Sequence, residues 1–220
     1  MLKRRYWTDY FQNEDNIYRI YNGAALYNET GSEDFYVSSC IFLECKENGA
    51  IYIKRNNSIC TLLEDSVFRK CSSSLQDGGG SVFYVCEQEG QFVQQRTCYY
   101  KSIADQCMAF ALIVKSSPTY KNYAIDVSVS NCGESELKGA ITFAIISGDL
   151  LISKINSTKN KCIAWSAINS GLEGSSGTCN FSTFRENNQT GFVSLRFWIS
   201  AESNSFSQTV SYSKYVSHFF

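Results

Sequence analysis

The stretch Gly49-Ala50-Ile51-Tyr52-Ile53 carries the pattern that decides the fold. It joins two small residues to a run of β-branched and aromatic residues, and it recurs as Gly79-Gly80-Ser81-Val82-Phe83-Tyr84. A second motif precedes each copy, first as Phe42-Leu43-Glu44-Cys45 and then as Phe68-Arg69-Lys70-Cys71. Two motifs that recur together at a fixed spacing indicate a repeat architecture.

The first motif can be followed along most of the chain. Its clear copies begin at Gly23, Gly49, Gly79, Gly139 and Gly191, at intervals of 26, 30, 60 and 52 residues. The last two intervals are twice the first two, which predicts a degenerate copy midway in each. Ala109-Phe110-Ala111-Leu112 and Ala164-Trp165-Ser166-Ala167-Ile168 lie at these places. The period therefore predicts seven copies, with the small residues Ala50, Ser81 and Ala140 in one column and the five glycines at structural corners.

The second motif places Cys or Asn three residues after an apolar residue. Its copies end at Cys45, Cys71, Cys132 and Asn187, and Cys107 and Cys162 mark two degenerate copies. These six residues are expected to form an inward ladder with one member per turn. The interval from Cys71 to Cys107 is 36 residues, against 25 to 30 for the other steps, and predicts an insertion between Cys86 and Cys98.

A third, looser segment alternates apolar and polar residues, as half-buried strands do. It stands at 59–63, 91–93, 125–129 and 150–153. Three short strands per turn predict an all-β fold: a single-stranded right-handed parallel β-helix (solenoid) of about seven turns. Glycine suits its sharp corners. An antiparallel sandwich of short strands is the alternative, but it does not explain a fixed period. Residues 21–198 are assigned to the helix, 1–20 to an N-terminal cap or degenerate turn, and 199–220 to a C-terminal cap, partial turn or tail.

The two motifs resemble those of the chlamydial polymorphic outer-membrane proteins and of Cys-rich surface proteins of trichomonad-type protists. The likeness rests on Gly49-Ala50-Ile51, Gly79-Gly80-Ser81-Val82, Gly139-Ala140-Ile141 and Phe184-Arg185-Glu186-Asn187, and it covers about residues 21–198. It implies a right-handed parallel β-helix with a role in adhesion at the cell surface or outside the cell. We read no signal peptide at the N-terminus, so a cytoplasmic protein or a fragment of a longer one stays an alternative.

Composition excludes several classes of function. The 220 residues carry 20 Lys and Arg against 21 Asp and Glu, a net charge of −1 that argues against nucleic-acid binding. No apolar stretch approaches the roughly 18 residues of a transmembrane segment. There is one His and no Cys-x-x-Cys pair among the ten cysteines, so we expect no metal site and no cofactor.

The cysteines are expected to act mainly as small buried apolar residues. Stacked thiols point in parallel, which disfavours the torsion angle of a disulfide. If the protein is exported, one or two disulfides remain possible among the cysteines outside the ladder: Cys40, Cys60, Cys86, Cys98 and Cys179.

Carboxylates are the other candidates for chemistry, because β-helices can host polysaccharide lyases and hydrolases whose acids lie on adjacent turns. The candidates are Glu64 with Asp65, Glu87 with Glu89, Asp105, Asp126, and Glu134 with Glu136. Most lie near expected bends, where solvated turn residues are common, and His218 has no nucleophile beside it. We therefore assign no catalytic residue.

Aromatic side chains and glycosylation sequences could mark a surface. Tyr52, Tyr84, Trp165 and Trp198 could stack on sugar rings, or they could instead point inward. Five Asn-x-Ser/Thr sequences would carry glycans in a secreted protein. They begin at Asn28, Asn56, Asn156, Asn180 and Asn188.

Three hypotheses of function follow. The first is a non-enzymatic repeat module for surface display or adhesion, whose partner would be a host or self surface protein or a glycan. The second is a carbohydrate-active β-helix enzyme, a polysaccharide lyase or hydrolase, or a degenerate relative of one. The third is a fragment of a larger β-helix surface protein.

Overall fold

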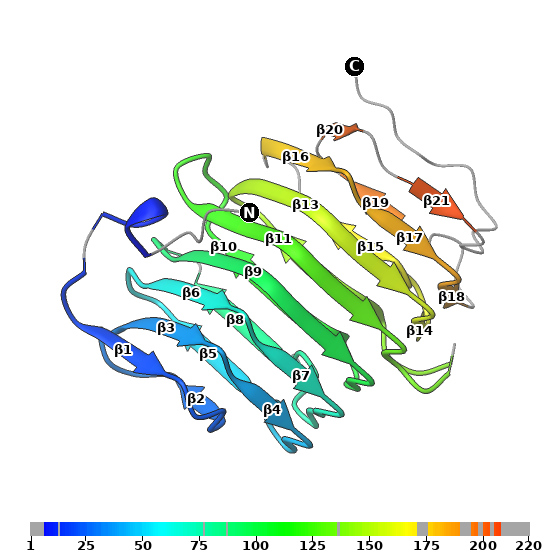
Figure 1. Ribbon diagram of the computed structural model, residues 1–220, viewed down its shortest axis with the longest axis horizontal. Helices are drawn as coiled ribbons and strands as arrows, with labels where there is room; N and C mark the ends of the chain where they lie inside the picture. The colour runs from blue at the N-terminus through cyan, green and yellow to red at the C-terminus, as the bar shows by residue number, and fades with distance from the viewer. Residues whose placement is uncertain are drawn as a thin grey trace.

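The strands coil into a parallel β-solenoid of about six turns, which confirms the predicted β-helix (Figure 1). The computed structural model describes residues 7–189 other than 13, 77, 87, 136 and 171–175, and also residues 195–197, 200–202 and 205–207. One sheet has seven described strands, and each predicted copy of the first motif precedes or overlaps one of them. Seven strands bound six complete turns, which accounts for the difference from the predicted seven turns.

The described strands form two long sheets along the solenoid and one short two-stranded sheet, and all their strand pairs are parallel. The main path of the first sheet consists of β1 (Ile17–Ile20), β3 (Asp34–Ser38), β6 (Cys60–Glu64), β9 (Gln91–Tyr100), β11 (Lys121–Ser130), β13 (Asp149–Thr158), β16 (Ser176–Asn180) and β20 (Ser200–Glu202). The short strands β4 (Ile41–Leu43), β7 (Val67–Arg69), β17 (Thr183–Arg185) and β21 (Ser205–Ser207) join the same sheet. The second sheet consists of β2 (Leu26–Asn28), β5 (Ile51–Arg55), β8 (Val82–Cys86), β10 (Cys107–Val114), β12 (Ile141–Ile146), β15 (Ile168–Ser170) and β19 (Leu195–Phe197). The third sheet pairs β14 (Lys161–Cys162) with β18 (Asn188–Gln189).

The three predicted strands of each turn are present, but two of them merge in the middle of the rod. Near the first turns the alternating segment and the Phe-x-x-Cys segment form separate strands, as in β3 and β4. In β9, β11 and β13 they form one continuous strand of 10 residues. A residue with positive φ still bends each long strand where the first turns break, at Arg96, Asp126 and Lys154.

Small residues form one column beside the second sheet. Backbone bonds and register align Ala50, Ser81, Ala109, Thr142 and Ala167, all fully buried. The predicted member Ala140 is therefore replaced by Thr142. The cause is a register shift between Cys107 and Phe110: Cys107 pairs with Ile141, whereas Phe110 pairs with Phe143. Thr142 brings a buried hydroxyl into a column that holds alanine on both neighbouring turns. This hydroxyl has a hydrogen-bond partner, because it donates to the Ser166 carbonyl at 2.6 Å.

Glycine is required at the predicted corners for two different reasons, a positive φ angle or a lack of space for a Cβ atom. Gly49 has a φ of 79°, and a Cβ there would lie 2.9 Å from the Gly79 carbonyl oxygen on the next turn. At Gly79, φ is not positive, but a Cβ would lie 2.1 Å from the Val82 carbonyl oxygen. Gly23 and Gly139 also have positive φ, whereas Gly191 lies outside the described residues.

The second motif closes a corner whose members follow from strand register. They are Cys45, Cys71, Ser102, Cys132, Asn160 and Asn187. Cys107 and Cys162 are not in this column, which is a correction to the predicted ladder: Cys107 begins β10 in the second sheet and Cys162 ends β14. Ser102 and Asn160 take their places because either residue can fill a small buried position and form hydrogen bonds there. The steps are then 26, 31, 30, 28 and 27 residues, so the predicted insertion is unnecessary.

The described part of the N-terminal segment, from Trp7 onward, lies on a side of the solenoid and not over its end. After the 3₁₀ helix η1 (Trp7–Asp9), Tyr10 and Phe11 continue across the outer face of the first sheet, where the segment packs on Leu62 and Val93. β1 then forms the incomplete first turn beside β3. Within the described residues, the segment predicted as a cap or degenerate turn is therefore a cover on one face followed by a partial turn.

Candidate functional surface

Among the candidate acids, Glu64 and Asp65 most resemble a pair of catalytic carboxylates. Both carboxylates, however, already accept hydrogen bonds from other side chains of the protein. Glu64 is fully buried and accepts hydrogen bonds from Gln95 Nε2 and Arg96 Nη2, both at 2.9 Å, and from the Tyr36 hydroxyl. Arg96 Nε and Nη2 bind Asp65 at 2.6 and 3.0 Å. The cluster thus holds its charges in hydrogen bonds within the protein, as buried charges require.

The N-terminal segment closes this cluster from outside. The Tyr10 hydroxyl donates to Gln95 Oε1 at 3.0 Å, and Trp7 and Tyr10 are buried above the same sheet. Burial and the neighbouring Glu64 carboxylate raise the pKa of Tyr36 to about 12, so this phenol keeps its proton and remains a donor. A substrate could not reach Glu64 while this segment is in place.

The remaining candidate acids do not converge. Glu89 lies between β8 and β9, Asp105 precedes β10, Asp126 lies within β11, and Glu134 follows β11. All four are exposed, and Glu134 pairs with Lys138 at 3.5 Å. Glu87, Glu136 and His218 lie outside the described residues. Within the described part of the chain, no group of His, Cys, Asp and Glu is arranged to hold a metal ion.

All ten cysteines are free thiols in this structure. Burial raises the pKa of Cys60, Cys71, Cys107, Cys132 and Cys179 to about 12 and that of Cys162 to about 11. Burial also raises the pKa of Cys86 and Cys98. Thiols with raised pKa values are poor nucleophiles, because the thiolate is the reactive form. Cys40 is buried, and its Sγ lies 3.4 Å from the Ile20 carbonyl oxygen.

The aromatic residues suggested for sugar stacking are mostly occupied. Tyr52 is stacked between Tyr27 and Phe83, with ring centroids 4.8 and 5.1 Å apart. Tyr84 is fully buried and donates to the Ile59 or Gln91 carbonyl. Trp165 is half-buried, and Trp198 lies outside the described residues.

The five glycosylation sequences differ in exposure. Asn56 and Asn156 are exposed, and Asn180 and Asn188 are half-buried. Asn28 is half-buried, and its Oδ1 accepts a hydrogen bond of 2.6 Å from Arg55 Nε.

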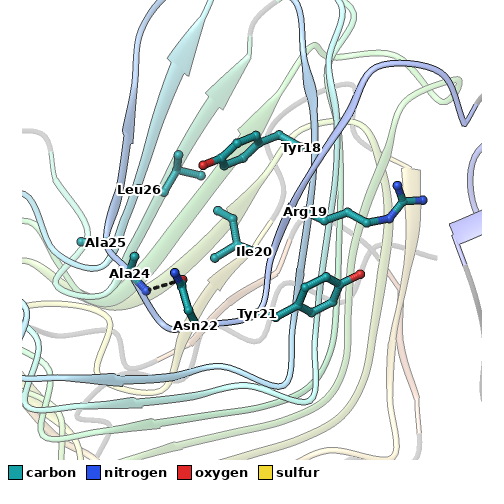
Figure 2. Close-up of a pocket in the computed structure, with 8 residues that line it drawn as sticks. All are labelled: Tyr18, Arg19, Ile20, Tyr21, Asn22, Ala24, Ala25 and Leu26. Carbon is teal, nitrogen blue, oxygen red and sulfur yellow. Dashed lines mark hydrogen bonds between the residues drawn. The ribbon is translucent and has the colours of Figure 1, made fainter.

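Two depressions stand out on the described part of the chain. One, of about 300 Å³, is the open first turn, where Figure 2 shows Tyr18, Ile20 and Leu26 projecting inward while Arg19 and Tyr21 point away. The other, of about 510 Å³, lies at the second-motif corner and is lined by Asn131, Lys159, Lys161, Glu186 and Asn188.

The second depression adjoins a flat surface that we call the outer strand face. It consists of outward side chains at two positions of each second-motif strand, two residues apart. One column holds Ile41, Val67, Cys98, Ser128, Asn156 and Thr183. The other holds Leu43, Arg69, Tyr100, Ser130, Thr158 and Arg185. All twelve are exposed or half-buried, and they change from apolar at the first turns to hydroxyl, amide and charged groups later.

Each side of the outer strand face is bounded by a column of non-glycine residues with positive φ. One column is Ser39, Asp65, Arg96, Asp126, Lys154 and Phe181, and the other is Glu44, Lys70, Lys101, Asn131, Lys159 and Glu186. Such backbone costs free energy and persists only where surrounding contacts fix it. Here each turn fixes the next: Lys70 N–H, for example, donates to the Tyr100 carbonyl at 2.8 Å. Sequence reasoning missed these columns, although both lie at constant offsets from the second motif.

We compared the chain with protein-family models, curated proteins and solved structures, and no match was found in any of the three. The described residues include no helix with the length and hydropathy of a membrane span. The fold thus defines a class, the parallel β-solenoids, and the outer strand face is the feature of this member from which a function can be argued.

Proposed function

We propose that this chain is a non-enzymatic β-solenoid module of the cell surface or extracellular space that binds an extended partner, a glycan or a protein surface, on its outer strand face. The observation that carries the proposal is the register of that face. Six turns present side chains in two columns, and neighbouring side chains in a column are separated by about one strand spacing of 4.8 Å. An elongated ligand can therefore make the same kind of contact on successive turns.

The engaged state of Glu64 and Asp65 supports a binding role over hydrolysis or β-elimination. A retaining or inverting glycosidase needs two carboxyl groups on either side of a sugar, with at least one free to donate a proton. Glu64 instead lies beneath the N-terminal segment, and Asp65 accepts two hydrogen bonds from Arg96. The likeness of the two motifs to adhesion proteins points to the same role.

The test is a binding and cleavage assay on a panel of soluble polysaccharides and on intact cells. The wild-type chain is expected to bind at least one of them without forming new reducing ends or unsaturated sugars. Ser128→Trp, which places a bulky ring in the centre of the outer strand face, should abolish that binding. Ser116→Trp, in the exposed loop after β10, is the matched control and should bind as wild type does.

Two results would overturn the proposal. One is robust cleavage of a polysaccharide that is lost in Glu64→Gln or Asp65→Asn. The other is binding that is equal in Ser128→Trp and wild type, because the ligand would then lie elsewhere on the molecule.

A further inference from the structure

The incomplete first turn presents the edges of two sheets at one end of the solenoid. Within the described residues, β1 pairs only with β3 and β2 pairs only with β5, so each strand keeps one side without a neighbouring strand. Such edges pair readily with further strands unless charges, prolines or a covering segment block them. The described part of the N-terminal segment packs on the outer face of the first sheet and not on these edges.

The sequence of this turn contains little that blocks an edge. Residues 17–28 include one charged residue, Arg19, and no proline, whereas charged residues make up 19% of the whole chain. Three tyrosines of the turn are exposed instead: Tyr18, Tyr21 and Tyr27, with exposed fractions of 55%, 56% and 52%. Apolar side chains gathered beside open strand edges are typical of a site of association.

The aromatic contacts between turns also end at this turn. Tyr27 is the outermost described ring of a stack, and it lies on Tyr52 with ring centroids 4.8 Å apart and planes at 10°. Tyr18 lies edge-on to Phe35 with centroids 6.2 Å apart. Figure 2 shows Tyr18 and Leu26 on opposite sides of the open lumen, both projecting into it. Both sides of the coil therefore offer apolar contacts to an occupant that continues the stacking.

The two edges lie on opposite sides of one coil, which limits what can cover both at once. An extended peptide pairs with one edge, whereas another solenoid turn presents a strand to each. A second copy of this chain supplies such a turn. A two-fold axis perpendicular to the rod places β1 beside its equivalent and β2 beside its equivalent, and two-fold symmetry is the commonest arrangement of homo-oligomers.

We propose that two copies of this chain associate end to end through their first turns, with β1 and β2 each pairing antiparallel with the same strand of the second copy. The partner is thus a second copy of the chain, and the contact is isologous. This inference goes beyond the proposed function and does not depend on the outer strand face.

The register of the β1 pair follows from side-chain direction and charge. Opposite residues of an antiparallel pair point to the same face, so the axis must pass beside a residue that faces its own equivalent. An axis at Ile17 or Ile20 pairs only one residue of the strand, and an axis at Arg19 opposes two like charges, which is destabilising. An axis at Tyr18 instead brings the two Tyr18 rings together and sets Arg19 opposite Ile17 of the second copy.

Sedimentation equilibrium of the full chain measures the dissociation constant of this dimer. The contact is one incomplete turn from each copy, so we expect a constant of about 10–100 µM. Tyr18→Lys sets two ammonium groups opposite each other at the axis and should raise the constant by about tenfold or more. Tyr27→Lys on the other edge should also weaken the dimer. Both side chains are exposed in the single chain, and circular dichroism checks that each variant keeps the β fold.

The matched control is Phe181→Lys, which places the same charge at an exposed aromatic position after β16, on a later turn. It should stay within about twofold of wild type, since screening limits distant charges. A wild-type chain that stays monomeric at about ten times the expected constant would overturn the inference. So would equal effects of Tyr18→Lys and Phe181→Lys, or growth into open filaments, which requires contact between unlike ends.

A mixture of two variants tests the two-fold contact itself. Tyr18→Lys and Tyr18→Glu should each be monomeric at the concentration where wild type is dimeric, because each opposes like charges at the axis. Mixed in equal amounts, they should form a dimer that contains one copy of each, because opposite charges then meet across the axis. A mixture that stays monomeric would show that residue 18 does not face its own equivalent, and the proposed dimer would be wrong.

Discussion

One corner of the solenoid is closed by a thiol at some turns and by an amide at others, with the hydroxyl of Ser102 at one turn between the thiols. In the first turns and at Cys132 a thiol fills the column, whereas in the later turns an amide does, at Asn160 and Asn187. We call these the thiol corner and the amide corner. Both donate to the same place, the carbonyl of the apolar or small residue one turn earlier.

The lengths of these contacts differ. Cys71 Sγ lies 3.7 Å from the Phe42 carbonyl oxygen and Cys132 Sγ lies 3.9 Å from that of Tyr99. Asn160 Nδ2 lies 3.1 Å from the Val129 carbonyl oxygen, and Asn187 Nδ2 lies 2.9 Å from that of Ser157. The amide also has a strong acceptor, whereas a thiol sulfur is a weak one: Asn160 Oδ1 accepts the Cys132 N–H at 2.9 Å.

The neighbouring lumen column compensates for this difference. Beside the thiol corner, Phe68 is stacked between Phe42 and Tyr99, with centroids 4.8 and 4.7 Å apart and planes within 5° of parallel. Beside Asn160 the same column holds the small polar Ser157. Packing therefore stabilises the first turns where hydrogen bonding is weak, and hydrogen bonding stabilises the later turns where the stack is interrupted.

The largest effect is expected from Phe68→Ala, which removes the middle ring of the stack. Loss of a buried phenylalanine costs about 3–5 kcal/mol, because the cavity closes only partly. The free energy of unfolding in urea should fall by this amount. Ser157→Ala, at the same column position, should cost less than half as much. Near-equal losses would show that the two ends of the corner are stabilised in the same way.

A smaller loss is expected from Asn160→Ala. It leaves the buried Cys132 N–H and Val129 carbonyl without their partner, at a cost of about 2–4 kcal/mol. Asn156→Ala, an exposed control on the same strand, should change the free energy of unfolding by less than about 0.5 kcal/mol. An Asn160→Ala protein as stable as its control would contradict the role assigned to the amide.

The comparison also shows how far the sequence could be read. Strand type, period and the parallel coil followed from residues that must recur, such as Gly49-Ala50-Ile51 and Phe42-x-x-Cys45. Ser102 and Asn160 were missed because one column accepts a thiol, a hydroxyl or an amide, so residue identity is a poor guide there. Ala140 was misplaced because a local register shift in β10 leaves no short-range signal. The columns of positive-φ residues beside the outer strand face were missed because their members are 26 to 31 residues apart and align only when the turns stack.

Of the two corners, only the thiol corner should respond directly to alkaline pH, because an amide does not titrate there. The pKa of Cys132 is raised to about 12 by burial, against about 9 when exposed. Between these two pKa values the Cys132 thiol is deprotonated in the unfolded chain but stays protonated in the folded chain. The contribution of this thiol to the free energy of unfolding is therefore unchanged below pH 9 and falls as the pH rises above it. The slope is up to about 1.4 kcal/mol per pH unit for each such thiol.

Urea unfolding of wild type and Cys132→Ala at pH 8 and at pH 10.5 measures this effect. The free energy of unfolding should fall less between the two pH values in the variant than in wild type. The difference is the contribution of one titrating thiol, up to about 1.4 kcal/mol for each pH unit above pH 9. Asn156→Ala should lose as much as wild type. A variant with the full wild-type loss would show that Cys132 does not titrate in this window.

The smallest effect is expected from Cys71→Asn, which converts one thiol turn into an amide turn. By analogy with Asn160, the new Nδ2 can donate to the Phe42 carbonyl, and the new Oδ1 can accept the Cys45 N–H. The added hydrogen bonding contributes about 1 kcal/mol, and the two extra side-chain heavy atoms in a packed lumen oppose it, so we expect a change within about 1 kcal/mol of wild type. The reciprocal Asn160→Cys should lose about 1–3 kcal/mol, because the Cys132 N–H loses its acceptor. If instead Cys71→Asn cost more than Asn160→Cys, the aromatic stack would leave no room for an amide, and packing would set the residue type at this corner.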